Sequence, residues 1–185
     1  MQVRQSAPGR VNLIGEHTDY QGGYVLPLAI PQKTTVTLRP RADRDVHVAS
    51  KSFADGEHQQ HFSLGSEART GRWVDYVQGV TFALRTVAPL PAGFDADIES
   101  DVPVGSGLSS SAALEVALLR ALREAFALPF DDRQLALCAQ RAEVEFVGAP
   151  VGVMDQMACT LADTTHALFL DTRALTWERI PIPPT

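Results

Sequence analysis

PVGSGLSSSAALEVALLRAL, residues 103–122, joins the end of a predicted strand to a predicted helix through a segment of glycines and serines. Gly105 and Gly107 allow the backbone to approach a ligand closely, because glycine has no Cβ atom. The serines supply hydroxyl groups and can cap the helix, whose N-terminus offers free N–H groups and the positive end of the helix dipole. A strand, a glycine-rich turn and a helix in this order predict a loop that binds phosphate.

The loop differs in sequence from two common phosphate-binding motifs. A Walker A loop requires Gly-Lys-Ser/Thr, and this stretch contains no lysine. The GxGxxG pattern is not met either, because residues 108–110 contain no third glycine. A flexible turn followed by an ordinary helix N-cap is the simpler alternative, but two glycines and three serines at a helix start favour phosphate binding.

The segments on both sides of this loop predict a mixture of strands and helices. Apolar alternation with β-branched residues predicts strands, and apolar residues at helical spacing predict helices. The predicted strands cover residues 6–14, 24–30, 34–40, 46–50, 58–64 and 94–104, and a closing hairpin covers 166–172 and 175–182 around Arg173 and Ala174. The predicted helices cover residues 73–87, 109–127 and 132–147. Because strands and helices do not alternate as regular βαβ units, the order favours an α+β fold over a doubly wound sheet.

The composition is that of a globular protein, since 45% of the 185 residues are hydrophobic and 21% are charged. The formal net charge of -6 argues against nucleic-acid binding. No stretch approaches the roughly 20 apolar residues that span a bilayer, and the N-terminus lacks the apolar segment of a signal peptide. We therefore expect no membrane partner and a cytoplasmic protein. Cys138 and Cys159 form no CxxC pair, which argues against a disulfide framework or a structural zinc site.

A second group of polar residues lies in GRVNLIGEHTDYQGG, residues 9–23, and includes Arg10, Glu16, His17 and Asp19. Val11, Leu13 and Ile14 favour a buried strand for the same segment, so its polar groups are expected to converge on a ligand. A polar surface turn fits these residues equally well.

A third segment, GAPVGVMDQMACTLAD at residues 148–163, places Asp155 in an apolar, glycine-flanked turn. A short helix is predicted to begin there. An aspartate at that position can simply cap the helix, so its meaning depends on the residues that lie near it.

Together, these three segments resemble the galactokinases, a family of the GHMP small-molecule kinases. GRVNLIGEHTDY (9–20) is similar to the galactokinase signature, PVGSGLSSSAA (103–113) to the ATP-binding motif, and GVMDQ (152–156) to the segment with the catalytic aspartate. The resemblance extends from Ser6 to nearly the last residue. It implies that residues 1–185 form an α+β domain like domain 2 of ribosomal protein S5, the N-terminal domain of a GHMP kinase. Because family members are usually much longer, it also implies that their C-terminal domain is absent from this chain.

The resemblance implies ATP- and Mg²⁺-dependent phosphorylation of the C1 hydroxyl of α-D-galactose to galactose 1-phosphate. Asp155 would face that hydroxyl as a base or as an orienting anion, with Arg10 beside it. The implied sugar-binding residues are Glu16, His17, Asp19 and Gly152. The implied ATP-binding residues are Gly105, Ser106, Gly107, Leu108, Ser109, Ser110, Ser111 and Ala112. The implied Mg²⁺ ligands are Ser111 and Glu143.

Two further expectations concern single positions. Gly152 is expected to let the sugar approach the backbone near Asp155. The acidic residues Glu115 and Glu124 are interpreted as charges on helix surfaces.

Two other functions stay open. The missing domain is compatible with a regulator that binds galactose and ATP without catalysis, although the intact loop and Asp155 argue for chemistry. A related kinase that acts on N-acetylgalactosamine or another sugar would differ in the shape of its pocket at C2. The sequence also leaves open whether the chain is active alone. Apolar surface exposed where the second domain would pack predicts self-association.

Overall fold

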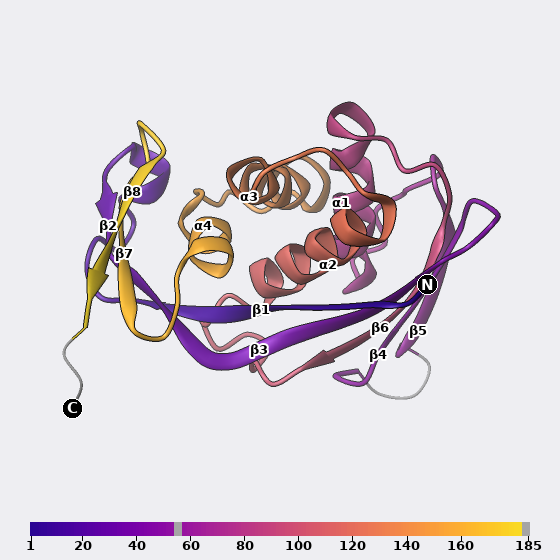
Figure 1. The fold of residues 1–185 in the computed structure, drawn as a ribbon, viewed down its shortest axis with the longest axis horizontal. Coiled ribbons are helices and arrows are strands. Elements are labelled where there is room, and N and C mark those ends of the chain that lie inside the picture. The colour runs from indigo at the N-terminus through magenta and orange to yellow at the C-terminus, as the bar shows by residue number, and fades with distance from the viewer. Residues whose placement is uncertain (54–56, 183–185) are drawn as a thin grey trace.

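The computed structural model describes residues 1–53 and 57–182, which form two β-sheets and the helices that pack on them (Figure 1). The larger sheet has the strand order β1-β3-β6-β4-β5. Its strands are β1 (Val3–Asn12), β3 (Pro27–Pro40), β4 (Asp45–Ser50), β5 (Gln59–Ser63) and β6 (Phe94–Ser100). The smaller sheet has the order β2-β7-β8 and consists of β2 (Tyr24–Val25), β7 (His166–Asp171) and β8 (Thr176–Pro181). This mixed architecture confirms the predicted α+β class.

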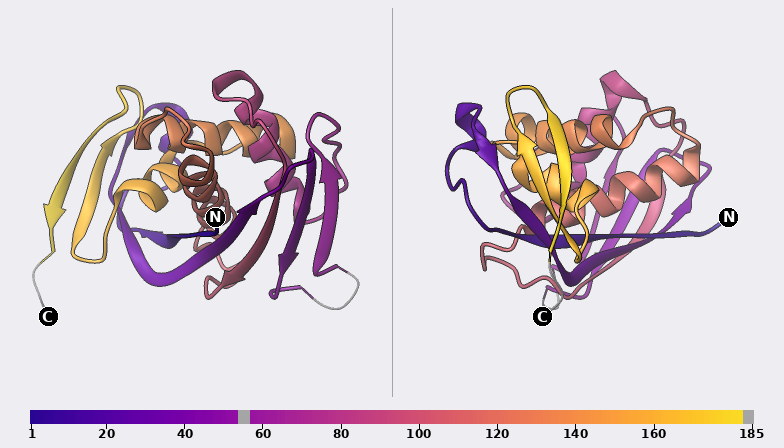
Figure 2. Two further views of the ribbon diagram at one scale, coloured as in Figure 1. Left: turned by 45° about the vertical axis from the view of Figure 1, so that its right-hand side comes forward. Right: turned by 60° about the vertical axis from the view of Figure 1, so that its left-hand side comes forward.

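The helices lie on one side of the larger sheet, and the smaller sheet stands at one end of the molecule (Figure 2). They are α1 (Val74–Val87), α2 (Ser110–Phe126), α3 (Asp132–Arg141) and α4 (Met154–Leu161). A π-helical segment, Ala142–Val147, continues α3. In the described part of the chain, no helix is long and apolar enough to cross a membrane.

The main core lies between the larger sheet and α2. Alternate strand residues, such as Leu38 of β3 and Phe94 of β6, are fully buried beneath the helices. Leu118 and Leu122 of α2 are also fully buried, and burial of each such side chain contributes roughly 1.5–3 kcal/mol. Because α2 packs on β1 and β3 and is covered by α1 and α3, it is enclosed on nearly all sides.

The structure differs from the prediction at residues 24–40. Instead of strands at 24–30 and 34–40, one long strand, β3, includes both segments from Pro27 onward, and only β2 is separate. Both halves of β3 pair with β1, whose register shifts between Pro8 and Arg10. Pro31 lies opposite this irregularity, where its missing N–H does not interrupt a regular ladder. The strand therefore continues through a residue that would usually end one.

The other predicted elements agree in type with the structure, and their bounds differ by a few residues. The predicted strand at 94–104 ends at Ser100, so the phosphate loop begins earlier than expected. The predicted helix at 132–147 is α-helical only to Arg141. The hairpin of β7 and β8 forms as predicted.

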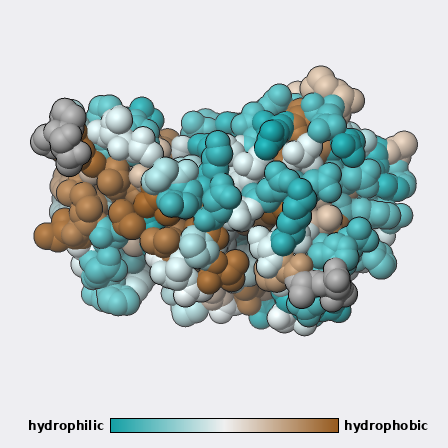
Figure 3. Space-filling model, turned by 90° about the horizontal axis from the view of Figure 1, so that it is seen from below, coloured by the Kyte–Doolittle hydropathy of each residue, from teal (hydrophilic) through white to brown (hydrophobic). Residues whose placement is uncertain are grey.

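Large apolar side chains are exposed at the end of the molecule that carries the smaller sheet. Figure 3 shows hydrophobic surface concentrated at that end. Leu13 and Ile14 follow β1 and are 55% and 69% exposed. Tyr24 and Phe169 are also exposed and stack on each other, with ring centroids 5.4 Å apart.

Candidate active site

The predicted phosphate loop connects β6 to α2. Gly105 (φ 72°), Gly107 (φ 74°) and Ser109 (φ 59°) have left-handed backbone conformations, which glycine adopts without strain. A Cβ atom on either glycine would meet no atom within 4 Å. The two positions therefore need glycine for its backbone conformation and not for lack of space. Helix α2 begins at Ser110, and its first turn contains no acidic residue. Its free N–H groups therefore point toward the loop and suit an anion.

Arg10 of β1 and Asp155 of α4 form an ion pair beside this loop. Arg10 Nε and Nη2 lie 2.8 and 2.6 Å from Asp155 Oδ1. The hydroxyl of Ser109 donates to Asp155 Oδ2 at 2.5 Å. The side chains of Arg10 and Asp155 are only 13% and 25% exposed. The carboxylate is thus held from two sides.

Gly9 allows β1 to approach the loop. A Cβ atom at Gly9 would lie 2.7 Å from the carbonyl oxygen of Leu108, closer than real Cβ contacts. The backbone N–H of Arg10 donates to the same oxygen at 3.1 Å, and Arg10 Nη1 donates to the carbonyl of Gly107 at 2.6 Å. The first sequence motif and the phosphate loop are therefore joined through the backbone, a contact that the sequence analysis did not predict.

Arg10, Asp155 and residues of the loop line a cleft of about 410 Å³. Aromatic residues line the same cleft. The rings of Phe53 and Trp73 stack with centroids 5.3 Å apart and planes 7° apart, and Tyr76 also lines the cleft. Flat aromatic rings beside a phosphate loop suit the base of a nucleotide. The sequence analysis did not identify these residues as site residues, because they come from two separate segments.

A group of buried carboxylates lies behind the loop, and it includes Glu115, which the sequence analysis placed on the helix surface. The prediction was wrong, because α2 is enclosed and Glu115 is 0% exposed. Gln156 Nε2 donates to Glu143 Oε2 at 2.8 Å. Burial raises the pKa of Glu115 and of Glu143, and the charge of Glu143 raises the pKa of Glu115 further. One sequence signal was present: a helix that is apolar on all sides is buried, together with its few charged residues.

Ser111 and Glu143 lie close enough for the Ser111 hydroxyl to lower the pKa of Glu143, against the effect of burial. Within the described residues, neither carboxylate oxygen of Glu115 has a hydrogen-bond partner. The same residues include no group of three or more His, Cys, Asp or Glu side chains that could hold a metal ion by themselves. A hydroxyl and a carboxylate are oxygen ligands of the kind that Mg²⁺ uses together with waters and phosphates. The residues therefore fit a Mg²⁺ ion that takes only part of its ligands from the protein.

Three of the predicted sugar-binding residues, Glu16, His17 and Asp19, lie between β1 and β2, around the 3₁₀ turn Asp19–Gln21, and the fourth, Gly152, precedes α4. Glu16 and His17 are exposed, and His17 has a left-handed backbone conformation with φ 60°. At Gly152, a Cβ atom would lie 2.1 Å from Asp19 Oδ2. The lack of a side chain there makes room for the Asp19 carboxylate, and the approach of a sugar to this backbone stays a prediction. The contact brings Asp19 to the start of α4.

The structure thus brings Arg10, Ser109 and Asp155 together in one cleft, with Ser111 lining the same cleft. Asp19 meets the segment that precedes Asp155. Glu16 and His17 are not among the residues that line this cleft in the described part of the chain.

Known proteins resemble this chain in sequence and in structure. The sequence model of the GHMP kinases N terminal domain matches residues 75–163, and that of the galactokinase galactose-binding signature matches residues 3–40. A galactokinase from Roseiflexus sp. is 48% identical over 180 residues, which are 97% of this chain and 45% of the relative. The structure of Lactococcus lactis galactokinase complexed with galactose is 34% identical and superposes with a TM-score of 0.93, over 98% of this chain and 47% of that one.

A more distant structure shows how widely the fold is shared. Mevalonate kinase from Methanococcus jannaschii is 18% identical and has a TM-score of 0.79, over 98% of this chain and 56% of that one. This chain spans about half the length of the relatives that it matches. The chain belongs to the galactokinases of the GHMP kinase superfamily and corresponds to their N-terminal part.

Proposed function

We propose that this chain carries the machinery for transfer of the γ-phosphoryl group of ATP to the C1 hydroxyl of α-D-galactose. The main observation behind this proposal is that Arg10 and Ser109 hold the carboxylate of Asp155 beside a phosphate loop. The match to a galactose-binding signature at residues 3–40 supports galactose as the sugar.

The nucleotide is proposed to lie along the cleft. Its base would lie against the aromatic residues of the cleft, near Phe53 and Trp73. Its phosphates would meet the loop at residues 105–112 and the N-terminus of α2, where free N–H groups and the helix dipole favour anions. Ser111 and Glu143 would hold Mg²⁺, which neutralises phosphate charge during transfer.

The sugar hydroxyl is proposed to donate a hydrogen bond to Asp155. Its oxygen then attacks the γ-phosphorus, the bond to the β,γ-bridging oxygen breaks, and ADP leaves. Asp155 either accepts the hydroxyl proton or orients the hydroxyl electrostatically. Each carboxylate oxygen has two lone-pair sites, so the contacts with Arg10 and Ser109 leave acceptor capacity for the sugar. Arg10 also supplies positive charge close to the transferring group.

Selectivity for galactose is proposed to come from Glu16, His17 and Asp19. Sugar isomers differ only in the direction of a hydroxyl group, so a site with a misplaced partner is left with an unpaired polar group. The Asp19 carboxylate already lies beside the backbone of Gly152. Glu16 receives a hydrogen bond from Asn12 Nδ2 at 2.9 Å, which limits its freedom.

The test incubates the 185-residue chain with Mg-ATP and galactose and detects the anomeric phosphate by ³¹P NMR. We expect galactose 1-phosphate from the unaltered chain and none from Asp155→Asn. Asp97→Asn is the matched control, because Asp97 is exposed on β6 and points away from the helices. Equal turnover by folded Asp155→Asn would refute the proposed role. Preferential use of N-acetylgalactosamine in a competition assay would refute galactose as the substrate.

A further inference from the structure

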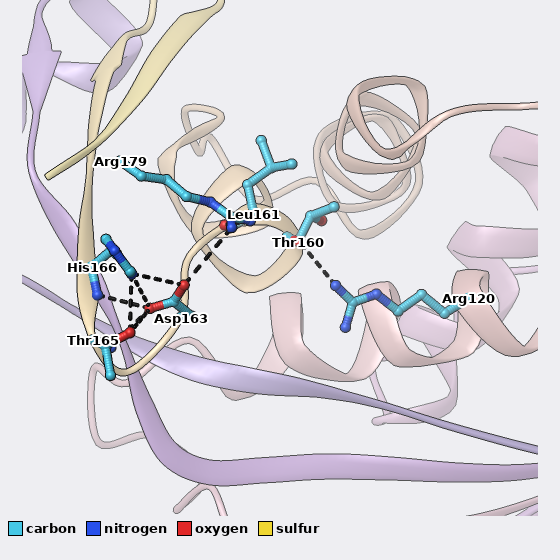
Figure 4. Close-up of polar contacts among 7 residues, drawn as sticks. All are labelled: Arg120, Thr160, Leu161, Asp163, Thr165, His166 and Arg179. Carbon is cyan, nitrogen blue, oxygen red and sulfur yellow. Dashed lines mark hydrogen bonds and ion pairs between the residues drawn. The ribbon is translucent and has the colours of Figure 1, made fainter. Parts of the chain in front are cut away.

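Arg120 connects two elements of the site from a position on α2. Its Nη1 donates to the carbonyl oxygen of Ser6 in β1 at 2.6 Å, and its Nη2 donates to the carbonyl oxygen of Thr160 in α4 at 2.8 Å. Both partners are backbone carbonyls, so the guanidinium joins the chain path of β1 to that of α4. Figure 4 shows Arg120 extending from α2 to Thr160.

These two elements also carry the catalytic pair. Arg10 lies further along β1 than Ser6, and Asp155 lies at the opposite end of α4 from Thr160. A strand rises about 3.3 Å per residue and a helix about 1.5 Å per residue. The Arg120 bridge therefore lies about 13 Å from Arg10 along β1 and about 7.5 Å from Asp155 along α4. Two separated contacts between two rigid elements fix the angle between them, whereas a single contact leaves that angle free to change.

The end of α4 offers the acceptors that such a bridge needs. The last carbonyl groups of a helix have no partner within it, and they form the negative end of the helix dipole. Arg120 satisfies the carbonyl of Thr160, and Arg179 Nη2 donates to the carbonyl of Leu161 at 2.9 Å. Both guanidinium groups are seen at this end of α4 in Figure 4. Of the two, Arg120 is the one that also bonds to β1.

We propose that Arg120 is a positioning residue for phosphoryl transfer, because its guanidinium holds α4 against β1 at the angle that brings Asp155 to Arg10. The proposal rests on the proposed function for its kinetic consequence. A displacement of about 1 Å at a reacting group can reduce a rate by about 100-fold. Removal of the bridge is therefore expected to lower kcat more than it changes KM.

The test compares three variants of the whole chain. Arg120→Met removes both donors and keeps an unbranched side chain. Arg120→Lys keeps the charge, but a single ammonium group lacks the wide planar fork that reaches two separate carbonyls. Arg179→Met is the matched control, because it removes a cap from the same helix end and leaves the link to β1 intact.

The first readout is hydrogen exchange of the Arg10 Nε–H group, which donates to Asp155. The exchange is followed in ¹H–¹⁵N spectra of the chain with ¹⁵N-labelled arginine. The Arg10 signal is assigned as the one that is lost in Arg10→Lys. We expect exchange to accelerate by about tenfold in folded Arg120→Met and in Arg120→Lys, and to stay within about twofold of the unaltered chain in Arg179→Met. If Arg120→Met does not fold, the Arg10 exchange rate in Arg120→Lys tests the proposal in its place. Unchanged Arg10 exchange in the folded variants, or equal acceleration in Arg179→Met, would overturn the proposal.

The second readout is turnover of galactose. We expect kcat to fall by about 100-fold in Arg120→Met, with KM for ATP changed by less than about threefold. An unaltered kcat in the folded variant would count against Arg120. If the unaltered chain makes no galactose 1-phosphate, the proposed function fails for this chain, whereas the Arg10 exchange rates still decide the role of Arg120.

Discussion

Replacement of Gly9 by alanine tests whether β1 and the phosphate loop depend on close backbone contact. The new Cβ atom would lie 2.7 Å from the Leu108 carbonyl oxygen, and ordinary contact begins at 3.4 Å, so the two segments must separate by about 0.7 Å. Such overpacking costs about 1–3 kcal/mol. The separation also weakens the hydrogen bond from the Arg10 N–H to Leu108, worth about 0.5–1.5 kcal/mol. We expect Gly9→Ala to lose about 2–4 kcal/mol of unfolding free energy.

The assay is urea unfolding followed by circular dichroism, with Gly71→Ala as the matched control. A Cβ atom at Gly71 would meet nothing within 4 Å, but its φ of 74° is unfavourable for alanine. That strain costs about 1–2 kcal/mol without any steric contact. Gly9 does not have a left-handed backbone conformation, so backbone strain would not explain a loss of stability in Gly9→Ala. If Gly9→Ala is as stable as the unaltered chain, the argument from close contact is wrong.

Three further predictions concern other parts of the chain. Hydrogen bonds from Thr165 hold the pKa of Asp163 below its ordinary value of 3.8, so the carboxylate stabilises the fold above about pH 4 and loses this effect as the pH falls. The difference in unfolding free energy between the unaltered chain and Asp163→Asn should shrink under acid conditions, and a difference that stays constant with pH would contradict this. Burial raises the pKa of the Cys138 thiol to about 12, so peptide mapping should find it unlabelled by iodoacetamide at about pH 8; labelling without denaturant would refute it. Exposed Phe169 and Ile180 are expected to support self-association, so sedimentation velocity should show less dimer for the double serine variant, and an unchanged dimer fraction would exclude this surface.

The sequence was sufficient to predict the α+β class, most elements and the motifs. Short-range signals explain this success: a capping box with Asp131 starts α3, and two glycines enable the turns of the phosphate loop. The contact between Arg10 and Asp155 followed only from the family resemblance, because the two residues are 145 positions apart. No periodicity within either segment predicts that they meet.

The errors have a common physical origin in tertiary packing. Glu115 was assigned to a helix surface, because a lone charge on a helix is usually solvated. That assignment failed once other elements enclosed α2. Separate strands were predicted at 24–30 and 34–40, but the chain continues as one strand through Pro31, because a register irregularity in β1 accommodates the proline. The contact between Gly152 and Asp19, a residue from a distant segment, was likewise not predicted.

The charged residues within α2 also explain why α4 packs at one defined position along α2. The buried face of α2 is rich in alanine, including Ala113, Ala117 and Ala121, and small side chains alone specify the position of a neighbouring helix weakly. Gln156 lies beside Glu115, and the Thr160 carbonyl binds Arg120. Residues four apart lie on one face of a helix, so Gln156 and Thr160 both face α2. A slide along α2 would break the hydrogen bond between Arg120 and the Thr160 carbonyl, and a buried acceptor left without a partner costs roughly 1–3 kcal/mol. Asp155 precedes Gln156 on α4, and this register therefore also sets the position of the Asp155 carboxylate.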